Sequence, residues 1–153
     1  MSGLFGVASN KDCREILFYG TDYHSHLGTE KAGLAVFNRR IHRSIHNIST
    51  SQFKSKFINE IEKMKGKTGI GAISDLDPQP IIISSSFGNF ALATTGAPIE
   101  KEKLIRKIMA DGGSFSEMSG GRINTTEVVG KIIAEKKNIL IGIKNFFAKT
   151  KGA

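Results

Sequence analysis

The chain has 153 residues, with 22 lysines and arginines against 14 aspartates and glutamates, which gives a formal net charge of +8 at pH 7. A hydrophobic content of 39% with 24% charged residues excludes a disordered chain, and the length suits one domain, which we expect to span residues 1–153. No run approaches the roughly 20 apolar residues of a membrane span, and no secretory signal opens the chain, so we expect a cytoplasmic protein.

The first half of the chain is expected to contain three strands and two helices. Short apolar or alternating runs predict the strands at residues 3–9, 33–38 and 41–48, with the last two forming a hairpin. Apolar side chains recur at helical spacing in the remaining segments. We therefore expect helices from Asp12 to Gly28 and from Phe53 to Gly66, each ended by a glycine.

The second half changes from strands to helices. Short β-prone runs predict strands at residues 68–74, 80–85 and 89–94, and helical spacing follows at residues 104–109, 128–133 and 139–147. Asn124 with Glu127 three residues later predicts a helix start of the capping-box type. Because strands and helices do not alternate strictly, the order favours an α+β sandwich over a doubly wound parallel fold.

Several common chemistries find little support. Cys13 is the only cysteine, which excludes an internal disulfide and a thiolate zinc site, and the four histidines lack metal-binding spacing. We therefore expect no metal and no cofactor. The glycine pairs match no phosphate-binding loop, and the basic residues alternate with acids as they do on solvated helix faces. Nucleic-acid binding is thus the least favoured reading of the positive charge.

The start of the chain offers a nucleophile. Removal of Met1 would leave Ser2 at the terminus, directly before a glycine-rich strand. Its hydroxyl could then be activated by its own α-amine, whose pKa of ~7.7–8.0 leaves it partly neutral at physiological pH. Most Met-Ser starts have no catalytic meaning, so this feature needs further support.

Ordered sequence blocks supply that support over nearly the whole chain. They are Gly3-Leu4-Phe5-Gly6-Val7, the run from Tyr23 to Val36, Gly69-Ile70-Gly71, Gln79-Pro80, Thr94-Thr95-Gly96 and Asn124-Thr125-Thr126-Glu127-Val128. In order and spacing they resemble the N-terminal glutaminase domain of the amidophosphoribosyltransferases, a class II glutamine amidotransferase family. The resemblance implies an α+β fold of the N-terminal-nucleophile hydrolase type, an αββα sandwich, and a role in purine nucleotide biosynthesis.

The departures from that family fall on its functional positions. The family nucleophile is a cysteine, where this chain has Ser2, and the arginine that grips the glutamine carboxylate is replaced by Ser74. The Asn-Gly pair that stabilises the oxyanion appears as Thr95-Gly96, and the aspartate that holds the glutamine α-amine falls at Thr125. Loss of one oxyanion donor costs ~10²–10³ in rate, and a hydroxyl is a weaker nucleophile than a thiol.

The resemblance therefore implies an amidotransferase domain that is degenerate for glutamine hydrolysis. Any remaining activity would use Ser2 as nucleophile and the Gly96 N–H as oxyanion donor, with Ser74, Thr95 and Thr125 lining the substrate pocket. Glutamine or a related small amide is the implied ligand. A phosphoribosyltransferase domain in full-length relatives and a second copy of the chain are the implied partners. The alternatives are a non-catalytic ligand-sensing or partner-binding module and, less favoured, a basic nucleic-acid binder.

The end of the chain carries one further expectation. Residues 149–153 resemble the approach to a later strand of the family's domain. We therefore expect the sandwich to be incomplete in its second half.

Overall fold

The computed structural model describes residues 2–150 and divides the chain into two compact units. The first unit comprises Met1–Pro80 and Ala91–Thr95, and the second comprises Ile81–Phe90 and Gly96–Ala153. The resemblance noted for residues 149–153 falls mainly on residues 151–153, which lie outside the described residues. Met1 also lies outside them. The expectation of one domain over residues 1–153 stays a prediction.

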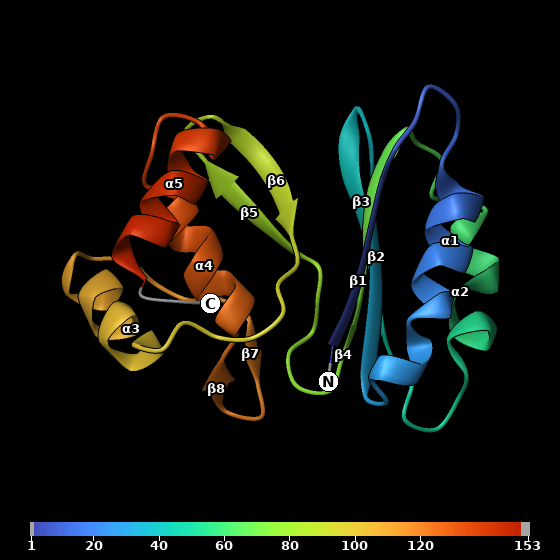
Figure 1. Cartoon of the computed structure of the whole chain (residues 1–153), viewed down its shortest axis with the longest axis horizontal. Coiled ribbons are helices and arrows are strands. Elements are labelled where there is room, and N and C mark those ends of the chain that lie inside the picture. Colours follow the sequence, from blue (N-terminus) through green and yellow to red (C-terminus); the bar gives the residue numbers. More distant parts are fainter. Residues whose placement is uncertain (1, 151–153) are drawn as a thin grey trace. The chain divides into compact units, whose positions relative to one another are not determined.

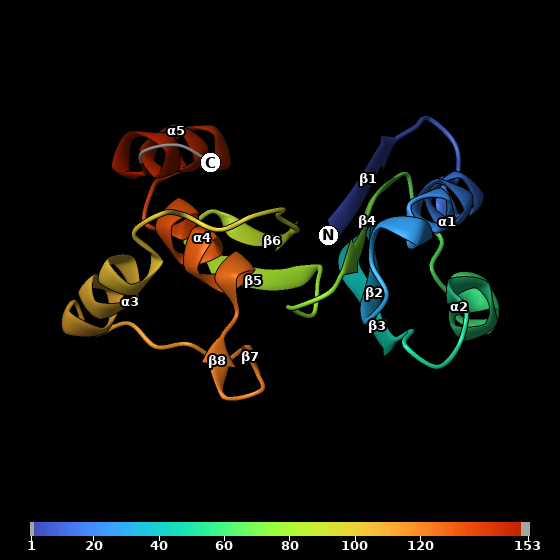
Figure 2. The same ribbon diagram turned by 60° about the horizontal axis from the view of Figure 1, so that its bottom comes forward.

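The first unit is built on a four-stranded antiparallel sheet with the order β1-β4-β2-β3. Its strands are β1 (Ser2–Ala8), β2 (Lys31–Asn38), β3 (Arg40–Asn47) and β4 (Thr68–Ser74). The helices α1 (Arg14–Tyr23) and α2 (Phe53–Ile61) lie against one face of this sheet, as Figures 1 and 2 show. The other face is free of helices from this unit.

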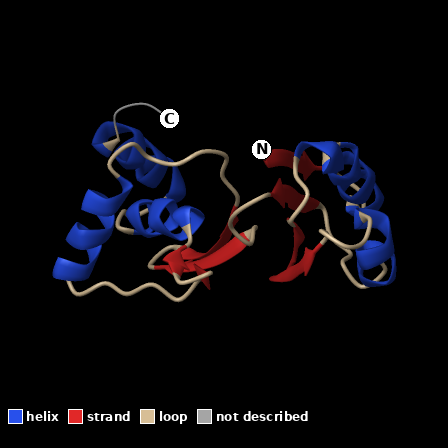
Figure 3. Cartoon of the chain, turned by 90° about the horizontal axis from the view of Figure 1, so that it is seen from below, coloured by secondary structure: helices blue, strands red, loops and turns tan. Residues whose placement is uncertain are grey.

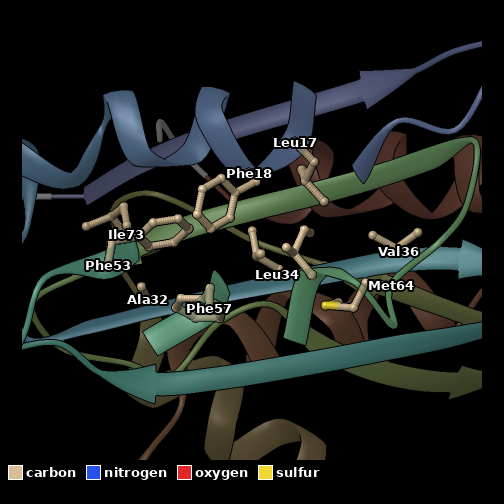
Figure 4. Close-up of a cluster of buried hydrophobic side chains, with 10 residues drawn as sticks. Leu17, Phe18, Ala32, Leu34, Val36, Phe53, Phe57, Met64 and Ile73 are labelled. Atoms are coloured by element: carbon tan, nitrogen blue, oxygen red, sulfur yellow. The ribbon is translucent and has the colours of Figure 1, made fainter. Parts of the chain in front are cut away.

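The core of the first unit lies between that sheet face and the two helices. Alternate residues of β2 point into it, and Figure 4 shows these aliphatic side chains meeting aromatic rings from α1 and α2. The cluster consists of Leu17, Phe18, Ala32, Leu34, Val36, Phe53, Phe57, Ile61, Met64 and Ile73. Helix α1 approaches β4 so closely that a Cβ on Gly71 would lie 1.9 Å from Thr21 Oγ1. Glycine is therefore required there by packing.

The second unit combines a β5–β6 pair with three helices, which Figure 3 shows in blue beside the shorter strands. Its elements are β5 (Ile81–Ser85), β6 (Gly88–Leu92), α3 (Lys101–Ala110), β7 (Met118–Ser119), β8 (Arg122–Ile123), α4 (Thr125–Ala134) and α5 (Ile139–Lys149). Helix α4 packs on β5 and is contacted by α3 and α5. Each unit thus contains one layer of strands and one of helices, the layers that an αββα sandwich combines.

The helix starts follow side-chain chemistry that is visible in the sequence. Asn124 Oδ1 accepts from the Thr126 N–H at 2.8 Å, and Asn138 Oδ1 accepts from the Ile141 N–H at 3.0 Å. Each such cap contributes about 1 kcal/mol. The predicted helix start at Asn124 is confirmed, but the side chain of Glu127 bonds to a loop and not to the helix start. The Glu127 carboxylate accepts N–H bonds from the loop before the helix, at Ser116 and Glu117.

The predicted strands and helices are present, with two differences at helix ends and one additional hairpin. The first helix stops at Tyr23, and a 3₁₀ turn, η1 (Ser25–Leu27), replaces its last part. The second stops at Ile61, after which i→i+3 bonds carry the chain to Met64. The short hairpin β7–β8 was not predicted. Its turn is Gly120-Gly121, both with positive φ, which is the usual composition of a two-residue hairpin turn.

Candidate active site

The beginning of β1 places Ser2 in a row of three polar residues. Ser2 is the cross-strand partner of Ser74 at the end of β4, and Ser74 is also the partner of Lys31 at the start of β2. Directly opposite residues of antiparallel strands share a face. Because their neighbours Ile73 and Ala32 belong to the core beneath the helices, the Ser2–Ser74–Lys31 row lies on the helix-free face.

The middle member of this row is a buried neutral hydroxyl. Ser74 is 3% exposed, and its Oγ accepts a hydrogen bond from the Leu76 N–H at 3.2 Å. The Leu76 carbonyl oxygen in turn accepts from Lys31 Nζ at 3.0 Å. The backbone of one residue in the loop after β4, Leu76, therefore connects Ser74 to an ammonium group.

Lys31 is a candidate site residue that the sequence analysis did not name. The resemblance places a carboxylate-binding cation at position 74, where the chain has serine, whereas the strand register brings a lysine to the next place in the same row. Lys31 is 43 positions earlier in the sequence (74 − 31), so only the pairing of β2 with β4 reveals the relationship. Lys31 lies two residues before the strand predicted at residues 33–38, so the sequence pattern did not include it.

The loop after the site is held against the helix-free face. Asp75 Oδ1 accepts from the Thr29 N–H at 2.7 Å, and the buried Gln79 accepts from the Thr94 N–H through Oε1 at 2.7 Å. The Gln79 carbonyl oxygen lies 1.9 Å from where a Cβ on Gly33 would stand. Glycine at position 33 thus lets the loop lie directly on β2, two residues along from Lys31.

A cavity continues this face along β1. It has a volume of about 310 Å³, and Leu4, Ile70 and Leu92 are among the residues that line it. Leu4 is two residues from Ser2 on the same strand and therefore lies on the same face. The cavity is at the lower end of the size range of small-molecule sites, roughly 300–1,000 Å³. A cavity of the size of a small-molecule site thus lies on the same face as the row.

The three remaining predicted site residues occupy different surroundings. Thr95 belongs to the first unit and is exposed, next to the Thr94 that Gln79 holds. Gly96 and Thr125 belong to the second unit. Gly96 has a φ of +78°, and a Cβ there would meet nothing within 4 Å, so its surroundings are open. Ser2 and Ser74 are the pair that the structure brings together.

Thr125 differs in charge from what the resemblance requires. It is the first residue of α4, and its Oγ1 lies 3.1 Å from Lys101 Nζ, which also donates to the Ile123 carbonyl oxygen at 3.2 Å. An aspartate at this position would bind the ammonium group of an amino acid. Here a neutral hydroxyl already accepts from an ammonium group, so the position is poorly suited to a second cation.

A serine, a histidine and a glutamate also meet elsewhere in the first unit. Ser44 Oγ lies 3.2 Å from His46 Nε2, which lies 2.9 Å from Glu60 Oε1. Both contacts use the same ring nitrogen, and Ser44 itself donates to Glu60, whereas a hydrolytic triad needs the two ring nitrogens on different partners. This trio ties β3 to α2 and is a packing contact.

The remaining chemistry-bearing groups are also structural. Burial and the neighbouring charge of Asp12 raise the pKa of the Cys13 thiol, which is fully buried and hence unreactive. Across residues 2–150, no group of three or more histidine, cysteine, aspartate or glutamate side chains could hold a metal ion. In the same part of the chain, no helix is long and apolar enough to cross a membrane.

The fold and the site together define a class of protein. The ordered sequence blocks resemble the glutaminase domain of the class II amidotransferases, and comparisons with known proteins are consistent with this resemblance. No family model matches the chain. The chain is 27% identical to an amidophosphoribosyltransferase of Methanocaldococcus jannaschii and 26% identical to that of Bacillus subtilis. These alignments cover 100% and 99% of this chain.

Solved structures agree with the sequence relatives. The glutamine phosphoribosylpyrophosphate amidotransferase of B. subtilis, complexed with ADP and GMP, matches with a TM-score of 0.83 at 25% identity over the whole chain. A structure described as the allosteric regulatory enzyme of purine biosynthesis also matches with a TM-score of 0.83, at 23% identity. The whole chain is thus similar to a part of amidophosphoribosyltransferases, which is consistent with a glutaminase domain, and the predicted fold class is confirmed. It spans 33–34% of the length of these relatives.

Proposed function

We propose that this chain is a glutamine amidotransferase domain of the amidophosphoribosyltransferase type whose glutaminase chemistry is strongly weakened. Homology over the whole chain supports the class of function. The observation that carries the weakening is the state of Ser74, a buried neutral hydroxyl already bonded to the loop where the family has its carboxylate-binding arginine. The location we propose is the cytoplasm.

The proposed reaction is acyl transfer from a small amide to Ser2. After removal of Met1, the Ser2 α-amine takes the hydroxyl proton while Oγ forms a bond to the amide carbon. The Gly96 N–H donates to the oxyanion, the carbon–nitrogen bond then breaks, and ammonia leaves with the proton. Water releases the acyl group in a second step. Without a side-chain amide donor beside Gly96, this reaction loses roughly 10²–10³ in rate.

Ligand recognition is the part of the function that the site retains best. Lys31 offers a positive charge in the same row as Ser2, and a cavity of about 310 Å³ lies along the same face. We assign Lys31 to the carboxylate of glutamine or a related small amide, with Ser74 and Thr95 beside it. In the second unit, the contact of Lys101 with Thr125 makes that position unsuited to an α-ammonium group.

That last contact also favours a second candidate, a non-catalytic ligand-sensing or partner-binding module. Lys101 beside Thr125 is unfavourable for the α-ammonium group of glutamine, whereas the fold and the cavity are still present. Such a module would bind a small carboxylate or amide without turnover.

The partners belong to the proposal as well. A phosphoribosyltransferase domain is proposed as the partner, since the relatives are about three times as long as this chain, and homo-oligomer assembly is proposed with it. Two large apolar side chains on α5 are exposed, Leu140 at 70% and Phe147 at 61%. Exposed apolar side chains of this kind are typical of a protein–protein interface.

A glutaminase assay with defined N-termini tests the proposal. Intact mass establishes whether Met1 has been removed, and release of ammonia and glutamate is then compared for the wild type, Ser2→Ala and Ser2→Cys. We expect slow release that Ser2→Ala abolishes and Ser2→Cys raises. Release that Ser2→Ala leaves unchanged would reject the mechanism. A ligand that raises the melting temperature without turnover would instead support the sensing module.

A further inference from the structure

A second pocket lies at the opposite end of the four-stranded sheet from Ser2. It forms where β2 ends and β4 begins, since Phe37 is the cross-strand partner of Thr68 and both residues line it. Its volume is about 420 Å³. The strand lengths separate it from the Ser2–Ser74–Lys31 row, so nothing assigned to that row accounts for this pocket.

The pocket is lined by three positively charged side chains, those of Arg39, Lys65 and Lys67. All three residues are exposed, and none takes part in an ion pair within the described part of the chain. They come from two separate segments, the β2–β3 turn and the approach to β4. The fold therefore gathers three unneutralised cations around one concave surface.

The acid in the lining does not neutralise them. Asp12 Oδ2 pairs with Arg14 Nε at 3.1 Å, and its Oδ1 accepts from the N–H groups of Arg14 at 3.3 Å and Gly66 at 3.2 Å. The carboxylate is thus directed to α1 and to the neighbouring loop. With three cations and one acid among its lining residues, the pocket carries a net positive charge, in keeping with the net charge of +8 of the whole chain.

Two further features distinguish this pocket from an ordinary basic surface. Phe37 is 53% exposed and is among the residues that line the pocket, so an apolar residue stands beside the cations. Arg39 has a φ of 61° and is the one non-glycine residue with positive φ among the described residues. A glycine would adopt this conformation without strain. The turn therefore carries a charged side chain at a position where the backbone conformation favours glycine.

We propose that this pocket binds a phosphorylated small molecule. The phosphoryl group would be held by Arg39, Lys65 and Lys67, and a planar or apolar part of the ligand would cover the ring of Phe37. A phosphate dianion suits several cations at once, and the volume fits a ligand of mononucleotide size. The inference is independent of the proposed amidotransferase function, because it uses none of the residues of that site.

Titration calorimetry of the full chain at low salt tests this site. The probes are inorganic pyrophosphate, AMP and adenosine, and the variants are Lys65→Gln/Lys67→Gln, Arg39→Gly and Phe37→Ala. Lys137→Gln, at an exposed lysine of the second unit, is the control for the loss of a positive charge. Arg39→Gly removes a cation and relieves backbone strain, so its effect on binding is separable from unfolding.

We expect saturable binding of pyrophosphate and AMP in the millimolar range or tighter, and weaker binding of adenosine. Since a hydrogen bond to a charged group contributes at least about a tenfold change in affinity, Lys65→Gln/Lys67→Gln should lower both affinities at least that much, and Lys137→Gln should not. Phe37→Ala should weaken AMP more than pyrophosphate. Absence of saturable binding, equal effects of Lys65→Gln/Lys67→Gln and Lys137→Gln, or binding of long nucleic acid alone would each overturn the proposal.

Discussion

Lys31 lies directly across the β2–β4 pair from Ser74, and both side chains are hydrogen-bonded to the backbone of the same residue, Leu76. The position expected to hold a cation is thus neutral, while a cation stands one strand further along the same row. If Lys31 anchors the ligand carboxylate, its neutralisation should weaken binding without unfolding the sheet.

The variant Lys31→Gln tests that relationship. We expect it to lower the affinity for glutamine, or for whichever small carboxylate the thermal-shift screen identifies, by about tenfold, since charge-assisted hydrogen bonds contribute ~1.5–3 kcal/mol. Affinity is measured by calorimetry, with Lys137→Gln as the control. Retention of full affinity in Lys31→Gln would show that another group holds the carboxylate.

The close approach of α1 to β4 predicts a sharp difference between two glycines of the same sheet. Gly71→Ala would place a Cβ 1.9 Å from Thr21 Oγ1, whereas the nearest atom to a Cβ on Gly6 is Ile70 Cγ2 at 4.0 Å. Overpacking of this kind costs about 1–3 kcal/mol. Urea unfolding should therefore show a clear loss of stability for Gly71→Ala and little change for Gly6→Ala. Equal stabilities would mean that α1 can move away from β4.

The contact of Glu60 with β3 predicts a pH-dependent contribution to stability. Burial alone would raise the pKa of Glu60, but hydrogen bonds from Ser44 and His46 outweigh it and hold this pKa below its usual value. A lowered folded-state pKa contributes stability above the unfolded-state value, about 4.3, and the contribution is lost as the pH falls through the folded-state value.

We therefore expect Glu60→Gln to be less stable than the wild type at pH 7. The difference should shrink when unfolding is measured at successively lower pH below about 4. The comparison at a neighbouring position is Glu62→Gln on the turn after α2, which loses only an exposed ion pair with Arg14. A difference for Glu60→Gln that stays constant over this range would contradict the assigned ionisation.

Substitution of the buried Glu127 should lower the stability more than that of Glu60, and its local effect should be confined to the second unit. Glu127 is 1% exposed and accepts N–H bonds from Ser116 and Glu117, with lengths of 2.8–3.1 Å. Glu127→Gln replaces one acceptor oxygen by a donor that faces N–H groups. This should cost about 1–3 kcal/mol, measured by urea unfolding, and amide exchange should accelerate at Ser116 and Glu117. Wild-type exchange rates there would show that the loop is held by other contacts.

The strands and helices of this chain could be predicted because short-range patterns determine them. Alternation in β3, the glycines after α1 and α2, and Asn124 before α4 each act within a few residues, and each predicted element is present. The element ends were less predictable. Whether a helix continues as a 3₁₀ turn, as it does at Ser25–Leu27, depends on the packing of η1 against β1 and β4, which no local pattern contains.

The site could be predicted only in part, for a related reason. Aligned blocks identified Ser2 and Ser74 as positions, but their pairing, and the arrival of Lys31 beside them, follow from the order β1-β4-β2-β3. The contact of Lys101 with Thr125 likewise joins residues 24 positions apart. Lys31 and Lys101 thus come from segments that are distant in the sequence from the residues they accompany, so a local pattern does not reveal them.

The position of Ser2 at the start of β1 has a practical consequence for handling the protein. The proposed base exists solely when nothing is attached to the nitrogen of Ser2, because an amide nitrogen does not accept a proton near neutral pH. An affinity tag fused ahead of this strand would silence the chemistry while leaving the sheet intact. Preparations for activity measurements should therefore carry their purification handle at the carboxyl end, or regenerate a free serine by proteolysis.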